Sequence, residues 1–274
     1  SALVLEVLAG SDIEHDATSS TREVENYYSL VDGNIKGKKI AYIKEINKGI
    51  KDQVIKDRFD YCLDLLRKNG ALVEEVSLDR SLLASLYPVY MIISCAEATS
   101  NNANLDGIKF GPRIGEETSY QEVMMKARTA GFGELIKRRF VIGSYSLLRE
   151  NQGVLFERAQ KVRHLLVDKV NDILKEYDAF IAPCSGRVKS EFVEHSDNVT
   201  DEIDIDKMII ENHLGIANFA GLPSLSIPVG IDNGFPFDFN ITGRAFEEVN
   251  VFNIAYALEN ELNLKNLSVI KEDR

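Results

Sequence analysis

The sequence predicts an α/β fold, with one compact body and a helical section inserted at about 80–150. A strand–helix–strand unit with tight connections occupies residues 39–78. Consecutive helical patterns fill the middle of the chain, and two short strands follow near its C-terminal end. Because no internal repeat or low-complexity linker separates these segments, we expect them to build a single body.

The N-terminal third supplies the strand–helix–strand unit. A short apolar helix over residues 2–9 ends at Gly10. Residues 39–43 form an apolar run typical of a buried strand. Apolar residues then recur at helical spacing, and Gly70 suits the left-handed position that ends such a helix. Residues 71–78 alternate as in a strand.

The remaining elements follow from the same patterns. The middle predicts helices over 82–104 (interrupted near Pro88), 119–128, 134–149 and 154–177. Residues 179–183 predict a buried strand, and the polar stretch 187–205 predicts a loop. A helix over 206–219 precedes strands at 224–230 and 236–243, which an Asp-Asn-Gly turn joins. A helix over 247–262 completes the fold.

Charge and cysteine content narrow the class of protein. The net charge of -11 leaves no broad basic surface for a phosphate backbone, so any RNA is expected to be held by a partner. The odd number of cysteines (Cys62, Cys95 and Cys184) indicates reduced thiols and a cytoplasmic location. We expect no membrane span, since the apolar runs look too short for one. The helix-like start at Ser1 favours a cut chain.

Common catalytic and metal motifs are missing from the sequence. It contains no Walker loop, GxGxxG, HExxH, CxxC pair or GxSxG. The histidines are scattered, at positions 15, 164, 195 and 213. A metal ligand at His195, beside Glu194 and Asp197, is conceivable. We favour a polar surface loop for this segment, because no second pair of metal ligands accompanies His195 in the sequence.

Four stretches together resemble the amidase-signature family: AEATSNNANLDGIKFGPR (96–113), GFGELIKRRFVIGSYSL (131–147), AQKVRHLLVD (159–168) and NFAGLPSLSIPVG (218–230). Within the family, the KRR and AQKVR pieces are most similar to the A subunits of the glutamyl-tRNA(Gln)/aspartyl-tRNA(Asn) amidotransferases. The resemblance runs from about residue 1 to 262. It implies that residues 1–274 are the C-terminal part of an amidase-signature domain, with a mixed central sheet covered by helices.

The resemblance also implies which catalytic groups are missing. Family members use a nucleophilic serine, a second serine joined through a cis peptide, and a neutral lysine that accepts the proton. These residues belong to the N-terminal half of the family's domain, the serines in a Gly/Ser-rich signature. The adjacent serines here, Ser19 and Ser20, lack the glycines. No catalytic residue is therefore assigned, and the chain alone is expected to be inactive.

Three substrate-binding positions do fall within the chain. The family's tyrosine, arginine and aspartate for the donor glutamine correspond to Tyr90, Arg139 and Glu211. The arginine would grip the α-carboxylate in a planar fork, and the acid would take the α-ammonium group. Glutamate keeps the charge of the family's aspartate but is one methylene longer, so its contact differs.

Each of these residues also has a structural interpretation. On pattern alone, Lys137-Arg138-Arg139 would be a solvated basic face, Tyr90 a core or boundary aromatic and Glu211 a surface acid. Residues 218–223 are expected to be a structural turn, in which Gly221 supplies backbone freedom and Pro223 fixes the entry to the strand.

The implied function is that of a glutaminase subunit. Ammonia released from glutamine would pass to a B subunit, which uses ATP and magnesium to convert Glu-tRNA(Gln) to Gln-tRNA(Gln), or Asp-tRNA(Asn) to Asn-tRNA(Asn). A small C subunit would tie the two together, and aminoacyl-tRNA would bind mainly through B. No cofactor or metal is expected in this chain. Two alternatives stay open: a fragment of another amidase-signature hydrolase, and a non-catalytic interaction module. We also expect the chain to self-associate, through surface that a longer protein would cover.

Overall fold

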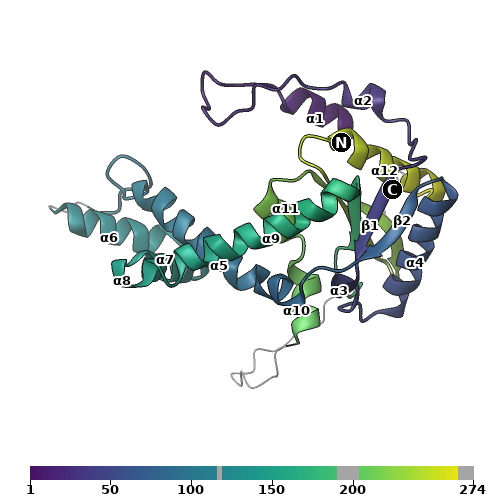
Figure 1. Cartoon of the computed structure of the whole chain (residues 1–274). Helices are drawn as coiled ribbons and strands as arrows, with labels where there is room; N and C mark the ends of the chain where they lie inside the picture. Colours follow the sequence, from purple (N-terminus) through teal and green to yellow (C-terminus); the bar gives the residue numbers. More distant parts are fainter. Residues whose placement is uncertain (116–118, 190–203, 265–274) are drawn as a thin grey trace. The chain divides into compact units, whose positions relative to one another are not determined.

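The computed structural model describes residues 1–115, 119–189 and 204–264. The chain divides into two compact units. A sheet unit combines residues 1–84 with 167–274, and a helical unit comprises residues 85–166. Figure 1 labels the helices and the strands β1 and β2. A helical section was expected at about 80–150 within a single body; the helices are present, but they form a compact unit of their own at residues 85–166.

The sheet unit is built on a mixed sheet, which in the described residues has five strands in the order β2-β1-β3-β5-β4. β1 lies parallel to both β2 and β3, whereas β5 runs antiparallel to β3 and β4. Their bounds are β1 Lys39–Ile43, β2 Leu72–Val76, β3 Ala179–Pro183, β4 Ser224–Asp232 and β5 Phe235–Gly243. The α/β prediction and its mixed sheet are confirmed.

Two amphipathic helices, α4 (Gln53–Lys68) and α12 (Glu248–Leu262), contact the sheet and each other. Their buried residues join those of the strands in one apolar core. At its centre, Phe59 of α4 meets Phe239 of β5 edge to face, with ring centroids 5.2 Å apart. The strand–helix–strand prediction for residues 39–78 is confirmed by β1, α4 and β2.

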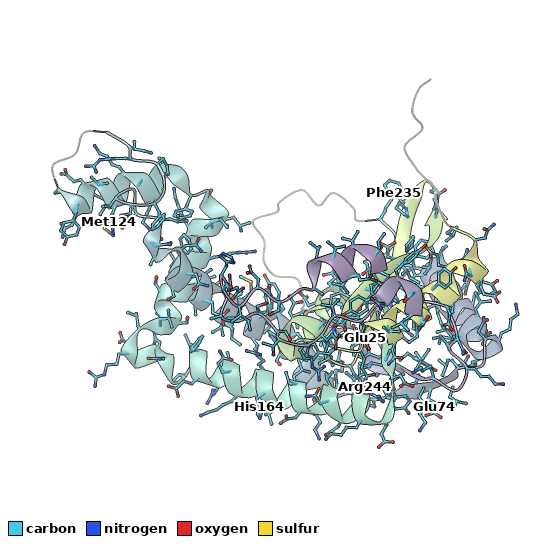
Figure 2. All side chains as sticks on the ribbon, turned by 90° about the horizontal axis from the view of Figure 1, so that it is seen from above. Glu25, Glu74, Met124, His164, Phe235 and Arg244 are labelled. Atoms are coloured by element: carbon cyan, nitrogen blue, oxygen red, sulfur yellow. The ribbon has the colours of Figure 1, made fainter. Side chains whose placement is uncertain are left out.

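The β4–β5 hairpin ends in the predicted turn. Asn233 and Gly234 both have positive φ, 48° and 84°, as a two-residue hairpin turn requires. Phe235 marks this end of the hairpin in Figure 2. In β4, Ser224, Ser226 and Pro228 are exposed, and the strand is at an edge of the described sheet, where proline is tolerated.

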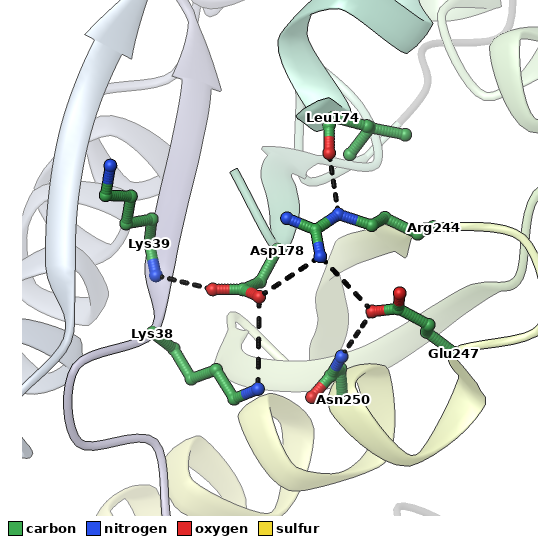
Figure 3. Close-up of polar contacts among 7 residues, drawn as sticks. All are labelled: Lys38, Lys39, Leu174, Asp178, Arg244, Glu247 and Asn250. Carbon is green, nitrogen blue, oxygen red and sulfur yellow. Dashed lines mark hydrogen bonds and ion pairs between the residues drawn. The ribbon is translucent and has the colours of Figure 1, made fainter. Parts of the chain in front are cut away.

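A polar cluster fixes the start of β3 relative to α12 (Figure 3). One carboxylate oxygen of Asp178 accepts the main-chain N–H of Lys39 at 2.8 Å. The other lies 3.6 Å from Nη1 of Arg244. Arg244 also donates to the carbonyl oxygen of Leu174 at 2.6 Å and pairs with Glu247. The cluster joins β1, β3 and the loop before α12.

Short helices complete the sheet unit: α1 Ala2–Leu8, α2 Tyr27–Leu30, α3 Lys44–Asn47, α10 Ile205–Asn212 and α11 Gly215–Ala220. The single helix expected over 206–219 is thus wrong. Its break follows from His213, whose ring nitrogen Nδ1 bonds the carbonyl oxygen of Ile210 at 2.8 Å. In a continuous helix that oxygen would accept the N–H of residue 214.

The helical unit contains α6 (Tyr120–Gly131), α7 (Glu134–Leu147) and α8 (Arg149–Gln152). It also takes most of α5 (Arg80–Asn101), the short η1 (Asn102–Asn104) and the first half of α9 (Phe156–Glu176). Ser119 caps α6 by accepting the N–H of Glu122. α5 continues through Pro88, where an interruption was expected. Pro88 is exposed and its neighbours Leu86 and Val89 are buried, so packing of the flanking turns outweighs the missing hydrogen bond.

One helical stretch among the described residues, Arg80–Asn104, is long and apolar enough to cross a membrane by length and composition. Its best 18-residue window has a mean hydropathy of 1.4. This corrects the expectation that no apolar run reaches that length, and the reason is the continuity of α5 through Pro88. A core helix meets the same criterion, so the stretch is weak evidence for a membrane span.

Candidate functional site

The predicted donor-binding residues Tyr90 and Arg139 are both in the helical unit, on α5 and α7. Tyr90 is 39% exposed, which agrees with a boundary aromatic. A few residues along α5, Cys95 and Ala96 are buried. The apolar side of α5 is therefore buried, and the side chain of Tyr90 lies at the boundary between that buried side and solvent.

The basic residues of α7 have three different surroundings. Lys137 donates from Nζ to the carbonyl oxygen of Thr129 at 2.5 Å. Arg138 is exposed and pairs with Glu134, Nη2 to Oε1 at 2.6 Å. Arg139 pairs with no carboxylate in the described part of the chain. The guanidinium of Arg139 is therefore open to an anionic ligand, whereas that of Arg138 has a carboxylate within hydrogen-bond distance.

The charge of Arg139 acts on Cys95 of α5. Burial raises the pKa of the Cys95 thiol, and the positive charge of Arg139 opposes this rise. The two helices touch one turn further along α7, at Gly143, where an added Cβ would meet the main chain of Cys95. Thr99 bridges them by donating to the carbonyl oxygens of Cys95 and Phe140, at 2.8 and 3.4 Å. The α5–α7 contact thus fixes the helices that carry Tyr90 and Arg139.

The third predicted residue, Glu211, lies in the last turn of α10 in the sheet unit. Ile209 and Ile210 anchor this helix in the interior. At its start Asp204 accepts the N–H of Lys207 at 3.0 Å. Oε1 of Glu211 lies 3.8 Å from Nζ of Lys207, and both side chains are about half exposed. Glu211 is therefore an accessible carboxylate with a weak partner on its own helix.

His213 is a buried group beside Glu211 that the sequence did not single out. Burial lowers the pKa of its imidazole to about 4. Since a carbonyl only accepts, the bond to Ile210 places the proton of the neutral ring on Nδ1. Nε2 is buried without a partner among the described residues. The sequence signal that could have found it is its apolar setting, IIENHLGIANF, at the end of a helix.

The remaining sequence candidates have structural roles or lie outside the described residues. The hydroxyls of Ser19 and Ser20 accept N–H groups of their own loop, at 2.9 and 3.2 Å. Gly221 has φ of 64° at the end of α11, which agrees with a structural turn. His195, Glu194 and Asp197 fall outside the described residues. In the described residues no three His, Cys, Asp or Glu side chains are grouped to hold a metal ion.

The fold and the family model define the class. Residues 1–252 match the model of the Amidase family, so this chain belongs to that family. The similarity to A subunits of the tRNA amidotransferases is also confirmed. The chain is 36% identical to the A subunit of the glutamyl-tRNA(Gln) amidotransferase from Brevibacillus brevis over 262 residues, which are 94% of this chain and 51% of that protein. The A subunit from Thermotoga maritima is likewise 36% identical, over 94% of this chain and 52% of its own length.

Solved structures agree with the sequence relatives. The crystal structure of the Thermotoga maritima A subunit superposes with a TM-score of 0.65 and 30% identity, covering 94% of this chain and 50% of that one. A bacterial aryl acylamidase of the amidase-signature family, at 19% identity and a TM-score of 0.61, shares the fold. The chain spans about half the length of the curated relatives it matches.

Proposed function

We propose that this chain is the C-terminal part of the ammonia-releasing subunit of a tRNA-dependent amidotransferase. The whole enzyme would convert Glu-tRNA(Gln) to Gln-tRNA(Gln), Asp-tRNA(Asn) to Asn-tRNA(Asn), or both. The similarity to amidotransferase A subunits over nearly the whole chain supports this proposal. The serine–serine–lysine triad would come from the other half of the amidase-signature domain, and the location would be cytoplasmic.

The contribution of this chain would be to hold the donor glutamine. Arg139 carries this proposal, because it is exposed on α7 and its guanidinium has no carboxylate partner in the described residues. A fork of two parallel N–H groups matches the α-carboxylate of glutamine. Tyr90 would contact the same ligand from α5, and Glu211 would bind the α-ammonium group. The Lys207 ammonium at 3.8 Å is easily displaced, since exposed ion pairs contribute little.

The proposed partners divide the remaining chemistry. A B subunit would bind aminoacyl-tRNA and use ATP and magnesium to activate its carboxylate, and a small C subunit would join the other two. The net charge of -11 supports this division, because an acidic chain repels the RNA backbone.

The decisive experiment is a glutamine-dependent amidation assay with the full-length protein and its partner subunits. Conversion of Glu-tRNA(Gln) or Asp-tRNA(Asn), with ammonia drawn from glutamine, is the expected result. Glutamine-independent hydrolysis of other amides, with no amidation of tRNA, would instead identify a different amidase-signature hydrolase.

A further inference from the structure

An open groove in the helical unit lies outside the proposed donor site. It has a volume of about 560 Å³. We call it the α6–α7 groove, and its lining residues are Arg128, Thr129, Phe132, Lys137, Phe140, Val141, Ser144, Tyr145 and Leu148. Arg139 and Tyr90 do not line it.

The floor of the groove is one face of α7, extended by the residue that follows the helix. Positions 137, 141, 144 and 145 recur at helical spacing, and with Leu148 they span about three turns, roughly 16 Å. Val141 is 69% exposed, Tyr145 58% and Leu148 45%, so this face presents a continuous apolar strip to solvent. Apolar strips of this length on a helix typically bind a segment of another chain.

The cations at the other end of the groove are positioned but not neutralised. Arg128 donates to the carbonyl oxygens of Asn102 and Leu105, at 2.8 and 3.1 Å. Its guanidinium lies over the rings of Phe132 and Phe140, 5.0 and 5.1 Å from their centroids. Lys137 donates to a carbonyl oxygen as well. The residues that line the groove include no acid, so no carboxylate of the lining faces these two positive charges.

The length, apolar surface and positive charge of the groove indicate what kind of ligand would bind there. A small ligand would leave most of the three-turn strip exposed, and two cations are too few to hold a nucleic acid backbone. A rigidly held guanidinium costs little entropy when it binds a carboxylate. An amphipathic segment with a row of apolar side chains and a carboxylate at one end matches the groove in length, polarity and charge.

We propose that the α6–α7 groove docks an amphipathic, acidic segment of another subunit of the amidotransferase. Its apolar side chains would cover Val141, Tyr145 and Leu148, and its carboxylate would face Arg128 and Lys137. This inference rests on the proposed function, because that function supplies the other subunits. The choice of a different subunit follows the names of the relatives, which are one subunit of a larger enzyme.

The test uses the full-length protein with its purified partner subunits. Val141→Asp places a charge on the apolar strip, and Lys137→Glu reverses a charge of the groove. Leu135→Asp and Arg138→Glu are matched controls, since both residues are exposed on α7 and neither lines the groove. The dissociation constant of the complex is measured by titration calorimetry at two salt concentrations, and circular dichroism verifies that each variant is folded.

We expect each groove variant to weaken assembly by roughly tenfold or more, and each control by about twofold at most. The effect of Lys137→Glu should shrink at high salt. Groove variants that bind the partners as tightly as their controls would overturn the proposal, as would loss of self-association alone with heteromeric binding unchanged. If the wild-type complex forms but amidates no tRNA, the proposed function fails, whereas the groove is judged by the dissociation constants.

Discussion

Gly143 of α7 touches the main chain of Cys95 on α5 so closely that a Cβ atom at residue 143 would overlap the Cys95 carbonyl group. The hydroxyl oxygen of Thr99 lies equally close to the same Cβ position. The absence of a side chain is therefore what allows the two helices to cross at this separation. The contact fixes the helix that carries Arg139 against the helix that carries Tyr90.

Gly143→Ala should accordingly destabilise the helical unit by about 1–3 kcal/mol, the usual cost of overpacking a close contact. Thermal unfolding monitored by circular dichroism measures this loss. Gly153→Ala is the matched control, because no atom lies within 4 Å of a Cβ at Gly153, which has helical backbone angles. Equal stability of the two variants would show that α5 and α7 do not cross at Gly143.

Arg139→Lys in the full-length protein should raise the apparent KM for glutamine by roughly tenfold while leaving the fold intact. Lysine keeps the charge but loses the planar fork that would hold the α-carboxylate. Steady-state kinetics over a range of glutamine concentrations provides the measurement. Arg138→Lys is the control, since Arg138 already pairs with Glu134 on the surface. An unchanged kcat/KM in Arg139→Lys would identify Arg139 as an ordinary surface cation.

The sequence predicted the elements well because their signals are local. The alternation of strand residues, the Asn233-Gly234 turn and the apolar stripe of α12 each depend on neighbouring residues. The errors at Pro88 and His213 have a different origin. Whether the helix continues through Pro88 or breaks at His213 depends on which side of the helix is buried. Residues distant in sequence determine that burial. Exposure made Pro88 tolerable, whereas burial made the His213 ring compete for a backbone carbonyl.

The candidate site likewise combines features that the sequence predicts with features that only the structure shows. A resemblance to the family placed Tyr90, Arg139 and Glu211, but only coordinates distinguish Arg139 from Arg138, which precedes it in the same basic run. The distinction depends on the ion pair of Arg138 with Glu134, since Arg139 has no carboxylate partner among the described residues.

Buried His213 should make the sheet unit less stable in mild acid. Its pKa is about 4 in the folded chain and ordinarily 6.5. Between these values the unfolded chain binds a proton that the folded chain excludes, so the free energy of unfolding falls as the pH drops from about 6.5 toward 4. The total loss is on the order of 3 kcal/mol. Urea unfolding at pH values across this interval measures the slope.

His213→Gln should flatten that slope, although it also lowers stability at neutral pH by altering a packed site. His164→Gln, which removes an exposed histidine, is the control and should leave the slope unchanged. A slope that persists in His213→Gln would show that other groups cause the acid sensitivity.

The 274-residue chain alone should release no ammonia from glutamine. None of its residues matches the catalytic serines or lysine of the family, and covalent catalysis needs an activated nucleophile. Incubation of the purified chain with glutamine, followed by an ammonia assay, tests this. Ammonia release that a serine-directed inhibitor abolishes would contradict it and would point to a nucleophile within the chain.

The last prediction concerns self-association of the 274-residue chain. α1 has no buried residue, and its apolar side chains Val7 and Leu8 are largely exposed. β4 lies at an edge of the described sheet, where unpaired N–H and C=O groups invite another strand. Both features favour a two-fold dimer that covers apolar surface and pairs sheet edges. Light scattering over a dilution series should therefore show a mass that rises with concentration.

Two lysine substitutions locate the contact. Val7→Lys should weaken the dimer if α1 is buried in it, and Ile231→Lys should do so if the β4 edge pairs, because a charged side chain resists burial at an interface. Val54→Lys, on exposed surface of α4, is the control. A monomer at every concentration would mean that the exposed strip of α1 and the β4 edge are stable in water, and that the sheet unit needs no further chain to cover them.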